Sequence, residues 1–397
     1  MKILFIAPRY HTNQLPIVRE LLRNNISVEY AVHYRGATED YSELEPVVLK
    51  KSVALRFKIW FDRLIGKKRN EEYYGLRYNA SIIDLIKVIR CSKPDLIVLR
   101  GKSITERKAC VISFLLGIPS VLYNQEPYYK PPVKSKIKRV LKKIYNFFVP
   151  RVRYTPVQVS NYEMLEKKGS LIVPPHTYFI PFAGEENPEA DSRCYLADGI
   201  VNFLMVGKFR EYKTHRLLVD ALAGIATKDG YRLTFVGQCS NQEEVVYFND
   251  LKEYVFSKGL GENISFVTNV EPSKMKDYYL NNDVLILPTK NEAASISVLE
   301  AMHYGMSVIS TSRNGTASYI EPGKSGYVFT TCDVLSLREK LMFYLNDPES
   351  VERMGRGALD AAKNNSSGRA YLTALKNMLD KEFPNLAEKI MNIDKIG

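Results

Sequence analysis

Two carboxylates lie beside a predicted helix start in the last third of the chain. An apolar run ends at Pro288, a short loop carries Glu292, and a helical pattern begins near Ser295. The first amides of a helix have no partners within it, so they suit a phosphate group. In this helix they belong to Ala294, Ser295 and Ile296. Glu300 lies about two turns further on, from where it reaches the hydroxyls of a ligand whose phosphates sit at the helix start.

Each carboxylate also has an ordinary structural explanation. Ser297 and Glu300 have the spacing of a capping box, in which the glutamate only satisfies a backbone amide. That interpretation starts the helix at Val298 and leaves it very short, so we favour a start near Ser295. Glu292 by itself is compatible with a solvated loop residue.

The rest of the chain supplies a framework for such a site. Short apolar runs alternate with helical patterns along both halves, which predicts parallel α/β units. The strands expected in the first half are Lys2–Ala7, Ser27–Tyr30, Asp95–Leu99, Pro119–Tyr123 and Tyr154–Val157, and those in the second half are Val201–Val206, Arg232–Val236, Ile264–Val267, Val284–Leu287 and Ser307–Ser310. We therefore expect two Rossmann-like, doubly wound domains that face each other across a central cleft, where ligands bind at the carboxyl ends of the strands.

Changes in composition mark the domain boundaries. Residues 184–196 are acidic, polar and interrupted by Pro188, and we interpret them as a linker. This assigns residues 1–183 to a first domain, 197–378 to a second, and 379–397 to a C-terminal helical tail, for which packing back toward the first domain is one arrangement. The region from Arg35 to Tyr78 breaks the alternation and is expected to be an insertion or a long loop.

Composition excludes several classes of protein. With 397 residues, 45% of them hydrophobic, the chain is long enough for two cores. No apolar stretch approaches the roughly 20 residues that span a bilayer, and Pro8 and Arg9 interrupt the apolar N-terminus too early for a signal peptide. Five scattered cysteines fit a reducing cytoplasm and give no pattern for a zinc site or a disulfide framework.

The formal charge of +12 is concentrated in two stretches. Many cations and no acid lie between Lys130 and Arg153, and a second basic stretch from Lys50 to Arg69 is interleaved with apolar residues such as Trp60. Such segments are typical of helices on an anionic membrane surface, with a solvated basic face as the alternative. We see no helix-turn-helix, zinc or aromatic-platform pattern, so we do not expect nucleic-acid binding.

The stretch around the two glutamates resembles a known family. Glu292 and Glu300, separated by seven residues and followed by Ala-Met-x-x-Gly, are similar to the pattern of glycosyltransferase family four, a large family of retaining GT-B transferases. The resemblance continues through Gly305–Thr311, Asn314–Ile320 and Gly323–Phe329, where the family has Gly-x-Pro-Val-Ile-x-Thr, Gly-Gly-x-x-Glu-x-Ile and Gly-x-x-Gly-x-Leu. It implies the GT-B fold, with Glu292 at the donor sugar, Glu300 at the ribose and the helix amides at the diphosphate.

Upstream, Val206–Leu218 resembles the family loop Gly-Arg-x…Lys-Gly, in which an arginine and a lysine hold the donor diphosphate. Lys208 replaces the arginine and Lys213 matches the lysine. The resemblance implies that both cations offset the charge growing on the leaving diphosphate, although lysine at position 208 lacks the bidentate geometry of arginine. Gly207 in this loop and Gly237 in Val236-Gly237-Gln238 are expected beside the donor nucleotide.

The first half departs from the family pattern. Members often have a histidine after the strand that corresponds to Pro119–Tyr123, whereas this chain has Gln125 and Glu126 as candidates for that role. The usual glycine-rich turn after the first strand is replaced by a segment with His11 and Asn13, and a third loop carries a cation pair suited to an acceptor phosphate. The acceptor-binding candidates are His11, Asn13, Arg100, Lys102 and Gln125, while Glu126 joins Glu292, Lys208 and Lys213 as catalytic candidates. For each, an incidental surface residue is the alternative.

We therefore expect a retaining, hexosyl-type glycosyltransferase. Its donor would be a nucleotide-diphosphate sugar, and its acceptor a lipid-linked oligosaccharide at the inner face of the cytoplasmic membrane, in the synthesis of a bacterial O-antigen (lipopolysaccharide), capsule or exopolysaccharide. In retaining enzymes of this fold the leaving diphosphate is thought to assist the incoming hydroxyl on the same face. The chain has no Asp-x-Asp pair, so we expect neither a metal nor another cofactor. The alternatives are a nucleotide-sugar epimerase of the same fold and a catalytically silent binding subunit.

Overall fold

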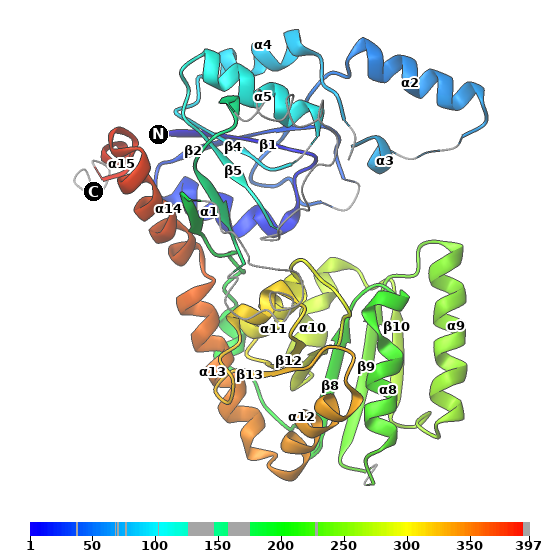
Figure 1. The fold of residues 1–397 in the computed structure, drawn as a ribbon. Helices are drawn as coiled ribbons and strands as arrows, with labels where there is room; N and C mark the ends of the chain where they lie inside the picture. The colour runs from blue at the N-terminus through cyan, green and yellow to red at the C-terminus, as the bar shows by residue number, and fades with distance from the viewer. Residues whose placement is uncertain are drawn as a thin grey trace. The chain divides into compact units, whose positions relative to one another are not determined.

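The structure, a computed structural model, describes residues 1–391 apart from residues 37–38, 68, 70, 76–77, 102, 126–146, 158–174 and 227–228. The described residues form two compact units (Figure 1). The first unit comprises residues 1–156, 175–183 and 368–391, and the second comprises residue 157 and residues 184–367. The polypeptide therefore leaves the first unit and returns to it at the C-terminus.

The first unit is built on a seven-stranded parallel sheet with the strand order β3-β2-β1-β4-β5-β6-β7. Its strands are β1 (Lys2–Ala7), β2 (Ser27–Val32), β3 (Val47–Val48), β4 (Leu96–Leu99), β5 (Ser120–Tyr123), β6 (Arg153–Thr155) and β7 (Thr177–Phe179). Alternate residues of β4 enter different cores: Leu96 and Val98 lie in one cluster, and Ile97 and Leu99 in another. The sheet is thus covered on both faces, as parallel sheets require.

The helices of the first unit divide between these two cores. α1 (Leu15–Arg23), α14 (Gly368–Glu382) and α15 (Pro384–Met391) contribute to the first cluster, and α14 packs on α1. α2 (Val53–Leu64), α3 (Glu71–Gly75), α4 (Ile82–Ser92) and α5 (Ile104–Leu115) contribute to the second. The C-terminal helices therefore complete the core of the N-terminal sheet.

The second unit contains a six-stranded parallel sheet with the order β10-β9-β8-β11-β12-β13. Its strands are β8 (Val201–Val206), β9 (Tyr231–Gly237), β10 (Ile264–Thr268), β11 (Val284–Leu287), β12 (Ser307–Thr311) and β13 (Gly326–Phe329). The helices are α8 (His215–Ala223), α9 (Gln242–Ser257), α10 (Met275–Leu280), α11 (Ile296–His303), α12 (Val334–Asn346) and α13 (Glu349–Asn365). Strand order reverses beside β8, which is where doubly wound sheets bind ligands.

Most elements expected from the sequence are present. Every predicted strand appears within a few residues of its expected bounds, and the described part of the predicted C-terminal helical tail contains the end of α14 and the whole of α15. The short strands β3, β7 and β13 were not predicted. The region from Arg35 to Tyr78, expected as an insertion or long loop, contains β3, α2 and α3.

The segment 184–196, interpreted from sequence as a linker, packs into the second unit. The guanidinium of Arg193 is buried and donates to the backbone carbonyls of Tyr279, Tyr304 and Asn282, close to the ends of α10 and α11. The C-terminal boundary also differs from the expected residue 379, because the chain rejoins the first unit at Gly368. The acidic residues and the proline of segment 184–196 suggested a linker. The hydrogen bonds from the buried guanidinium of Arg193 to carbonyls at helix ends instead fix this segment in the second unit.

Candidate active site

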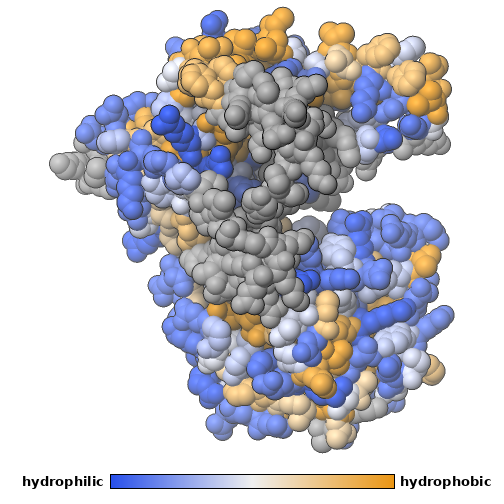
Figure 2. All heavy atoms as spheres, in the orientation of Figure 1, coloured by the Kyte–Doolittle hydropathy of each residue, from blue (hydrophilic) through white to orange (hydrophobic). Residues whose placement is uncertain are grey.

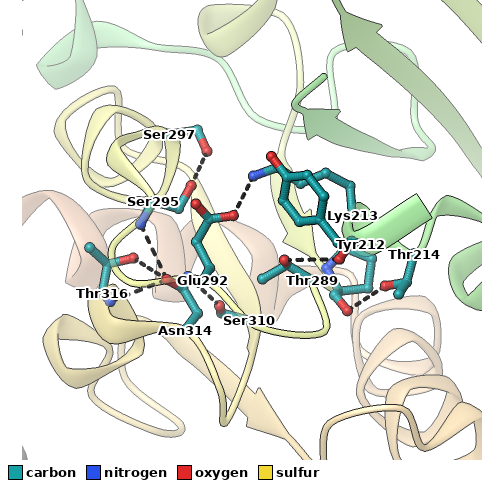
Figure 3. A network of polar contacts seen from close by, with 11 residues as sticks. Tyr212, Lys213, Thr214, Thr289, Glu292, Ser295, Ser297, Ser310, Asn314 and Thr316 are labelled. Atoms are coloured by element: carbon teal, nitrogen blue, oxygen red, sulfur yellow. Dashed lines mark hydrogen bonds and ion pairs between the residues drawn. The ribbon is translucent and has the colours of Figure 1, made fainter. Parts of the chain in front are cut away.

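Loops from four strands meet at the carboxyl edge of the second sheet. Hydrogen bonds tie the loop after β8 to the loop after β11: the amide of Lys290 and the hydroxyl of Thr289 both donate to the carbonyl of Tyr212, at 2.9 and 3.2 Å. The hydroxyl of Thr214 donates to the carbonyl of Pro288 at 2.6 Å (Figure 3). These contacts hold the two loops that carry the predicted catalytic lysine and glutamate.

The structure brings Lys213 and Glu292 together. Lys213 ends a short 3-10 turn, Glu211–Lys213, and its ammonium lies 2.6 Å from Oε2 of Glu292 (Figure 3). Lys213 is 7% exposed, so its charge needs a partner, and the ring of Tyr212 lies over the ammonium at 5.5 Å. Two residues predicted to act on one ligand thus form a single polar centre.

Asn314 fixes the loop that leads into α11. Its buried Oδ1 accepts hydrogen bonds from the amide of Ser295 (3.2 Å) and from the amide and hydroxyl of Thr316 (3.3 and 3.0 Å). Its Nδ2 donates to the hydroxyl of Ser310 at 3.0 Å (Figure 3). This role of Asn314 was not predicted from the sequence, although asparagine is a favoured N-cap residue and here caps the turn Gly315–Tyr319.

α11 begins at Ile296 with Ser295 as its N-cap, so the capping-box alternative is wrong. One expected phosphate donor changes, however. The amide of Ser295 is taken by Asn314, whereas the amides of Ala294 and Ile296 have no hydrogen bond to another described residue. The helix start therefore offers fewer free donors than its sequence suggested.

Glu300 lies in the second turn of α11 and is exposed to solvent. Its Oε2 accepts a hydrogen bond of 2.7 Å from the hydroxyl of Tyr279, which is 2% exposed. Burial, and next the charge of Glu300, raise the pKa of Tyr279 well above its usual value, so the phenol stays a donor. Tyr279 thereby orients the carboxylate of Glu300.

The two glycines of the donor loops are placed differently. A side chain on Gly237 would collide with the carbonyl oxygen of Gly207 and the ring of Phe209, so the ends of β8 and β9 approach closely only because position 237 is glycine. A methyl group on Gly207 would meet Lys213 at an ordinary 3.4 Å. Lys208, in the same loop, is exposed and has no ion pair with another residue in the described ranges.

Hydrogen bonds to the carboxylate of Glu244 join the loops after β8 and β9. The buried carboxylate accepts hydrogen bonds from the amide and hydroxyl of Ser240 (2.8 and 2.9 Å) and from Nε of Arg210 (2.8 Å). Burial acts to raise the pKa of Glu244, but these donors outweigh it and lower the pKa to about 2. Neither Glu244 nor Arg210 was predicted from the sequence. The spacing Asn241-x-x-Glu244, which is typical of a helix start, was the local signal for Glu244.

In the first unit, His11 is engaged by its own loop. Its Nδ1 lies 3.4 Å from Oε1 of Glu39, and its Nε2 accepts a hydrogen bond of 3.0 Å from Nε of Arg9. Glu39 also accepts from the amide and hydroxyl of Thr12, at 2.6 and 2.9 Å. Burial acts to raise the pKa of Glu39, yet the hydrogen bonds from His11 and Thr12 lower it to about 2. His11 thus braces the loop after β1, and its contact with an acceptor stays a prediction.

The other acceptor-binding candidates form a short chain of contacts at the carboxyl edge of the first sheet. Asn13 accepts a hydrogen bond of 3.0 Å from Gln14, and Gln14 in turn accepts one from the Arg100 guanidinium. Arg100 lies over the ring of Tyr123, 4.3 Å from its centroid. Gln125 lies just after the end of β5 and is partly buried. Lys102, Glu126 and most of the basic stretch Lys130–Arg153 lie outside the described residues.

Within the described ranges, no group of three or more histidine, cysteine, aspartate or glutamate side chains is arranged to hold a metal ion. None of the helices in the described part of the chain has the length and apolar content of a membrane span.

Comparison with known proteins identifies the segment that carries the site. Residues 198–360 match the model of the family described as glycosyl transferases group 1. The matched residues all lie in the second unit, which therefore resembles this family over most of its length. Its matched segment contains Lys208, Lys213, Glu292 and Glu300.

Two curated relatives share this region. The chain is 26% identical over 206 residues to the lipopolysaccharide core biosynthesis mannosyltransferase LpcC of Rhizobium leguminosarum bv. viciae, covering 50% of this chain and 58% of that protein. It is 29% identical over 259 residues to the D-rhamnosyltransferase WbpZ of Pseudomonas aeruginosa, covering 62% and 64%. The chain thus spans less than two thirds of the length of either relative.

A solved structure extends the similarity to both units. A glycosyltransferase from Rickettsia africae ESF-5 superimposes with a TM-score of 0.68, at 15% sequence identity and over 98% of each chain. The two parallel sheets with their helices are those of the GT-B fold, as the sequence predicted.

Proposed function

We propose that the protein is a glycosyltransferase that moves a sugar from a nucleotide-diphosphate donor to a hydroxyl group with retention of configuration. The observation that carries this proposal is the contact of 2.6 Å between Lys213 and Glu292, beside the start of α11 in the segment that matches the glycosyl transferases group 1 model. A cation for a leaving diphosphate and a carboxylate for sugar hydroxyls are thereby held in one place.

The proposed roles follow from the chemistry of each group. Lys213 offsets the negative charge that develops on the leaving diphosphate, with Lys208 adding a second cation at an exposed position. The amides of Ala294 and Ile296 bind diphosphate oxygens at the helix start. Glu292 accepts hydrogen bonds from the sugar, and Glu300, oriented by Tyr279, accepts them from the ribose.

Retention needs no carboxylate nucleophile in this scheme. The bond between the anomeric carbon and the diphosphate breaks, and the diphosphate oxygen takes the proton of the acceptor hydroxyl as that hydroxyl attacks the same face. The paired carboxylates of retaining glycosidases are therefore not required. We propose that the reaction proceeds without a metal, since Lys208, Lys213 and the helix amides supply the positive electrostatic field.

We further propose a lipid-linked oligosaccharide as acceptor, in the synthesis of a bacterial surface polysaccharide. The names of two relatives, a lipopolysaccharide core mannosyltransferase and a D-rhamnosyltransferase, support this context. Exposed apolar and basic residues on the first unit support a position on the inner face of the cytoplasmic membrane.

The test is to incubate the protein with a panel of nucleotide sugars and lipid-linked acceptors and to measure release of nucleoside diphosphate. Glu292→Gln should lower turnover at least a hundredfold while the protein stays folded, because glutamine keeps an acceptor for Lys213 but loses the charge. Glu271→Gln, on an exposed residue that forms an ion pair with the exposed Lys274, is the matched control. Full activity of Glu292→Gln would refute the site.

The same assay separates the alternatives. An epimerase would interconvert two nucleotide sugars without an acceptor, and a silent binding subunit would bind a donor without turnover. Activity that survives excess EDTA is expected, and activity that is lost with EDTA and restored by a divalent ion would refute metal independence.

The membrane proposal is carried by α2. This helix exposes a row of large apolar side chains, and Figure 2 shows hydrophobic surface over α2 and over α4 and α5. Its exposed apolar residues are Val53, Phe57, Trp60, Phe61 and Leu64, each between 46% and 73% exposed. The cations Arg56, Lys58 and Arg63 share the helix. Leu55 and Asp62 are its buried residues, and Asp62 accepts a hydrogen bond from Tyr74 at 3.0 Å. A helix that is held on the protein by its buried residues and exposes apolar and basic side chains to solvent suits an anionic bilayer surface.

Co-sedimentation with phosphatidylglycerol vesicles tests this. Trp60→Ser with Phe61→Ser should reduce binding about tenfold or more, and phosphatidylcholine vesicles should bind the unchanged protein weakly. Phe256→Ser, on an 81% exposed residue of the second unit, is the control. Equal binding by the α2 variant and the control would refute the proposal.

A further inference from the structure

Arg100 has an unusual environment at the carboxyl edge of the first sheet. It follows β4 directly and is partly buried. Strand register places it beside Tyr123 of β5, and Tyr123 is the cross-strand partner of Tyr154 on β6. The rings of these two tyrosines meet edge-to-face at 5.2 Å. The guanidinium thus ends a row of aromatic side chains on one face of the sheet.

The charge of Arg100 is not balanced within this surrounding. It donates to Gln14 and lies over the ring of Tyr123, but it has no ion pair with any carboxylate among the residues that the structure describes. Tyr30 and Tyr123 cannot neutralise it, because burial raises the pKa of both phenols, although Arg100 acts to lower it. A partly buried guanidinium without a counter-charge is costly unless an anion reaches it.

Two phenol hydroxyls lie beside the guanidinium. The hydroxyls of Tyr30 and Tyr123 are buried, and the hydrogen-bonding group beside each of them is the guanidinium of Arg100. Tyr30 is only 1% exposed as a whole residue. A phenol hydroxyl can donate to an anionic oxygen, so the cation and these two hydroxyls present complementary donors to one ligand group.

We propose that Arg100, Gln14 and the hydroxyls of Tyr30 and Tyr123 bind an anionic group of the acceptor, either a phosphate or a carboxylate. This inference rests on the proposed glycosyltransferase function, and it specifies the acceptor as acidic. Arg100 supplies the charge and a planar pair of donors, Tyr123 supports the guanidinium with its ring, and Gln14 fixes its orientation. The site belongs entirely to the first unit and is separate from the donor residues.

Calorimetric titration of the full chain with inorganic phosphate tests the site. Arg100→Gln should weaken phosphate binding at least tenfold, Arg100→Lys less, and Tyr123→Phe a few-fold, because each removes part of the donor set. Tyr10→Phe is the matched control: its hydroxyl is also buried, but its electrostatic neighbours are Tyr30, Asp40, Glu39 and Arg19. Thermal unfolding must show that each variant is folded.

Phosphate can also bind at the donor loops, so Lys208→Ala is measured in parallel. If Lys208→Ala abolishes phosphate binding and Arg100→Gln leaves it unchanged, the proposal is overturned. Titration with glucuronate distinguishes the two anions: tighter binding of glucuronate than of phosphate, lost in Arg100→Gln, assigns a carboxylate, and the reverse order assigns a phosphate.

Nucleoside diphosphate binding separates this inference from the proposed function. Arg100→Gln should bind nucleoside diphosphate as the unchanged protein does, while its KM for an acidic acceptor rises at least tenfold and its KM for the donor stays constant. A chain that binds phosphate through Arg100 but transfers no sugar would refute the function and leave the anion site intact. Equal acceptor KM values for Arg100→Gln and the unchanged protein would overturn the inference.

Discussion

At the scale of residues, the pair Lys213–Glu292 has a structural role as well as a chemical one. Lys213 is 7% exposed, and desolvating an ammonium group without a counter-charge costs several kcal/mol. Glu292 supplies that charge at 2.6 Å in the absence of a ligand. A donor diphosphate would bring further negative charge to a cation that is already positioned, so little reorganisation is needed on binding.

This dual role predicts non-additive effects on stability. Glu292→Ala should destabilise the second unit by about 2–4 kcal/mol, because it leaves Lys213 buried and unpaired. Glu292→Gln should cost less, and Lys213→Met combined with Glu292→Ala should recover most of the loss. Differential scanning calorimetry of the single and double variants measures the coupling. Additive losses would show that the two side chains do not stabilise one another.

His215 gives a second prediction at this scale. The ring is 1% exposed and stacks on Phe209, and burial, with Lys213 nearby, lowers its pKa from 6.5 to about 3. Because the folded pKa lies below the unfolded one, the unfolded chain binds the extra proton first as pH falls below 6.5. Stability present above pH 6.5 is therefore lost on acidification, by up to about 1.4 kcal/mol per pH unit.

Unfolding of His215→Phe against the unchanged protein checks this between pH 7 and 5. The variant should lose less stability over that interval, since phenylalanine keeps the ring stack but cannot bind a proton. Glu244 and Glu39 titrate at lower pH, and burial also lowers the pKa of His303, but these groups are common to both proteins and cancel in the comparison. Parallel pH profiles for the two proteins would contradict the assignment.

At the scale of elements, the site depends on how closely the ends of β8 and β9 approach. Gly207 donates to the carbonyl of Val236 at 2.9 Å, and Gly237 faces the carbonyl of Gly207 without room for a side chain. The buried Glu244 then ties the following loops together through Ser240 and Arg210. The conformation of the lysine-bearing loop is thus set by its neighbour as well as by its own sequence.

These contacts predict losses of stability of different size for two similar substitutions. Gly237→Ala should destabilise the second unit by roughly 1–3 kcal/mol, because a methyl group overlaps backbone that has little freedom to move. Gly207→Ala places its methyl at 3.4 Å from the flexible Lys213 side chain and should cost well under 1 kcal/mol. Thermal unfolding of both variants compares them directly, and a ranking of Gly207→Ala as the more damaging would contradict the packing.

At the scale of the whole molecule, the two units do not correspond to two continuous halves of the chain. α14 and α15 follow the second unit in sequence but belong to the first. Their buried residues Tyr371, Leu375, Met378 and Leu379 lie in the same core as Phe5 and Val98. The first unit is consequently incomplete until α14 and α15 are present.

A truncation tests this dependence. A chain ending at residue 367 should lose the calorimetric transition of the first unit and keep that of the second, because each large buried side chain contributes about 1.5–3 kcal/mol. A chain ending at residue 391 is the control and should behave as the full protein. Retention of both transitions at unchanged temperatures after removal of residues 368–397 would contradict the division into units.

The sequence by itself determined the features that depend on local pattern. Apolar runs and helical periodicity predicted the parallel strands of both sheets, and the loop with Glu292 followed by a helix start near Ser295 was confirmed within one residue. The spacing of Glu292 and Glu300 and the position of Lys213 also lie in short segments. Such features follow from neighbouring residues, so they are readable without the fold.

Only the tertiary structure decided the features that depend on distant partners. The amide of Ser295 is taken by Asn314, nineteen positions away, and Arg210 meets Glu244 across 34 positions. The boundary at residue 184 was predicted, but the packing of Arg193 into the second unit and the return of the chain to the first unit at Gly368 were not, because Arg193 and α14 contact segments remote in sequence. The surroundings of Arg100 likewise come from separate strands of one sheet. Hydrogen bonding and burial at these positions depend on which distant segments the fold brings together. The pattern of neighbouring residues in the sequence does not contain that information.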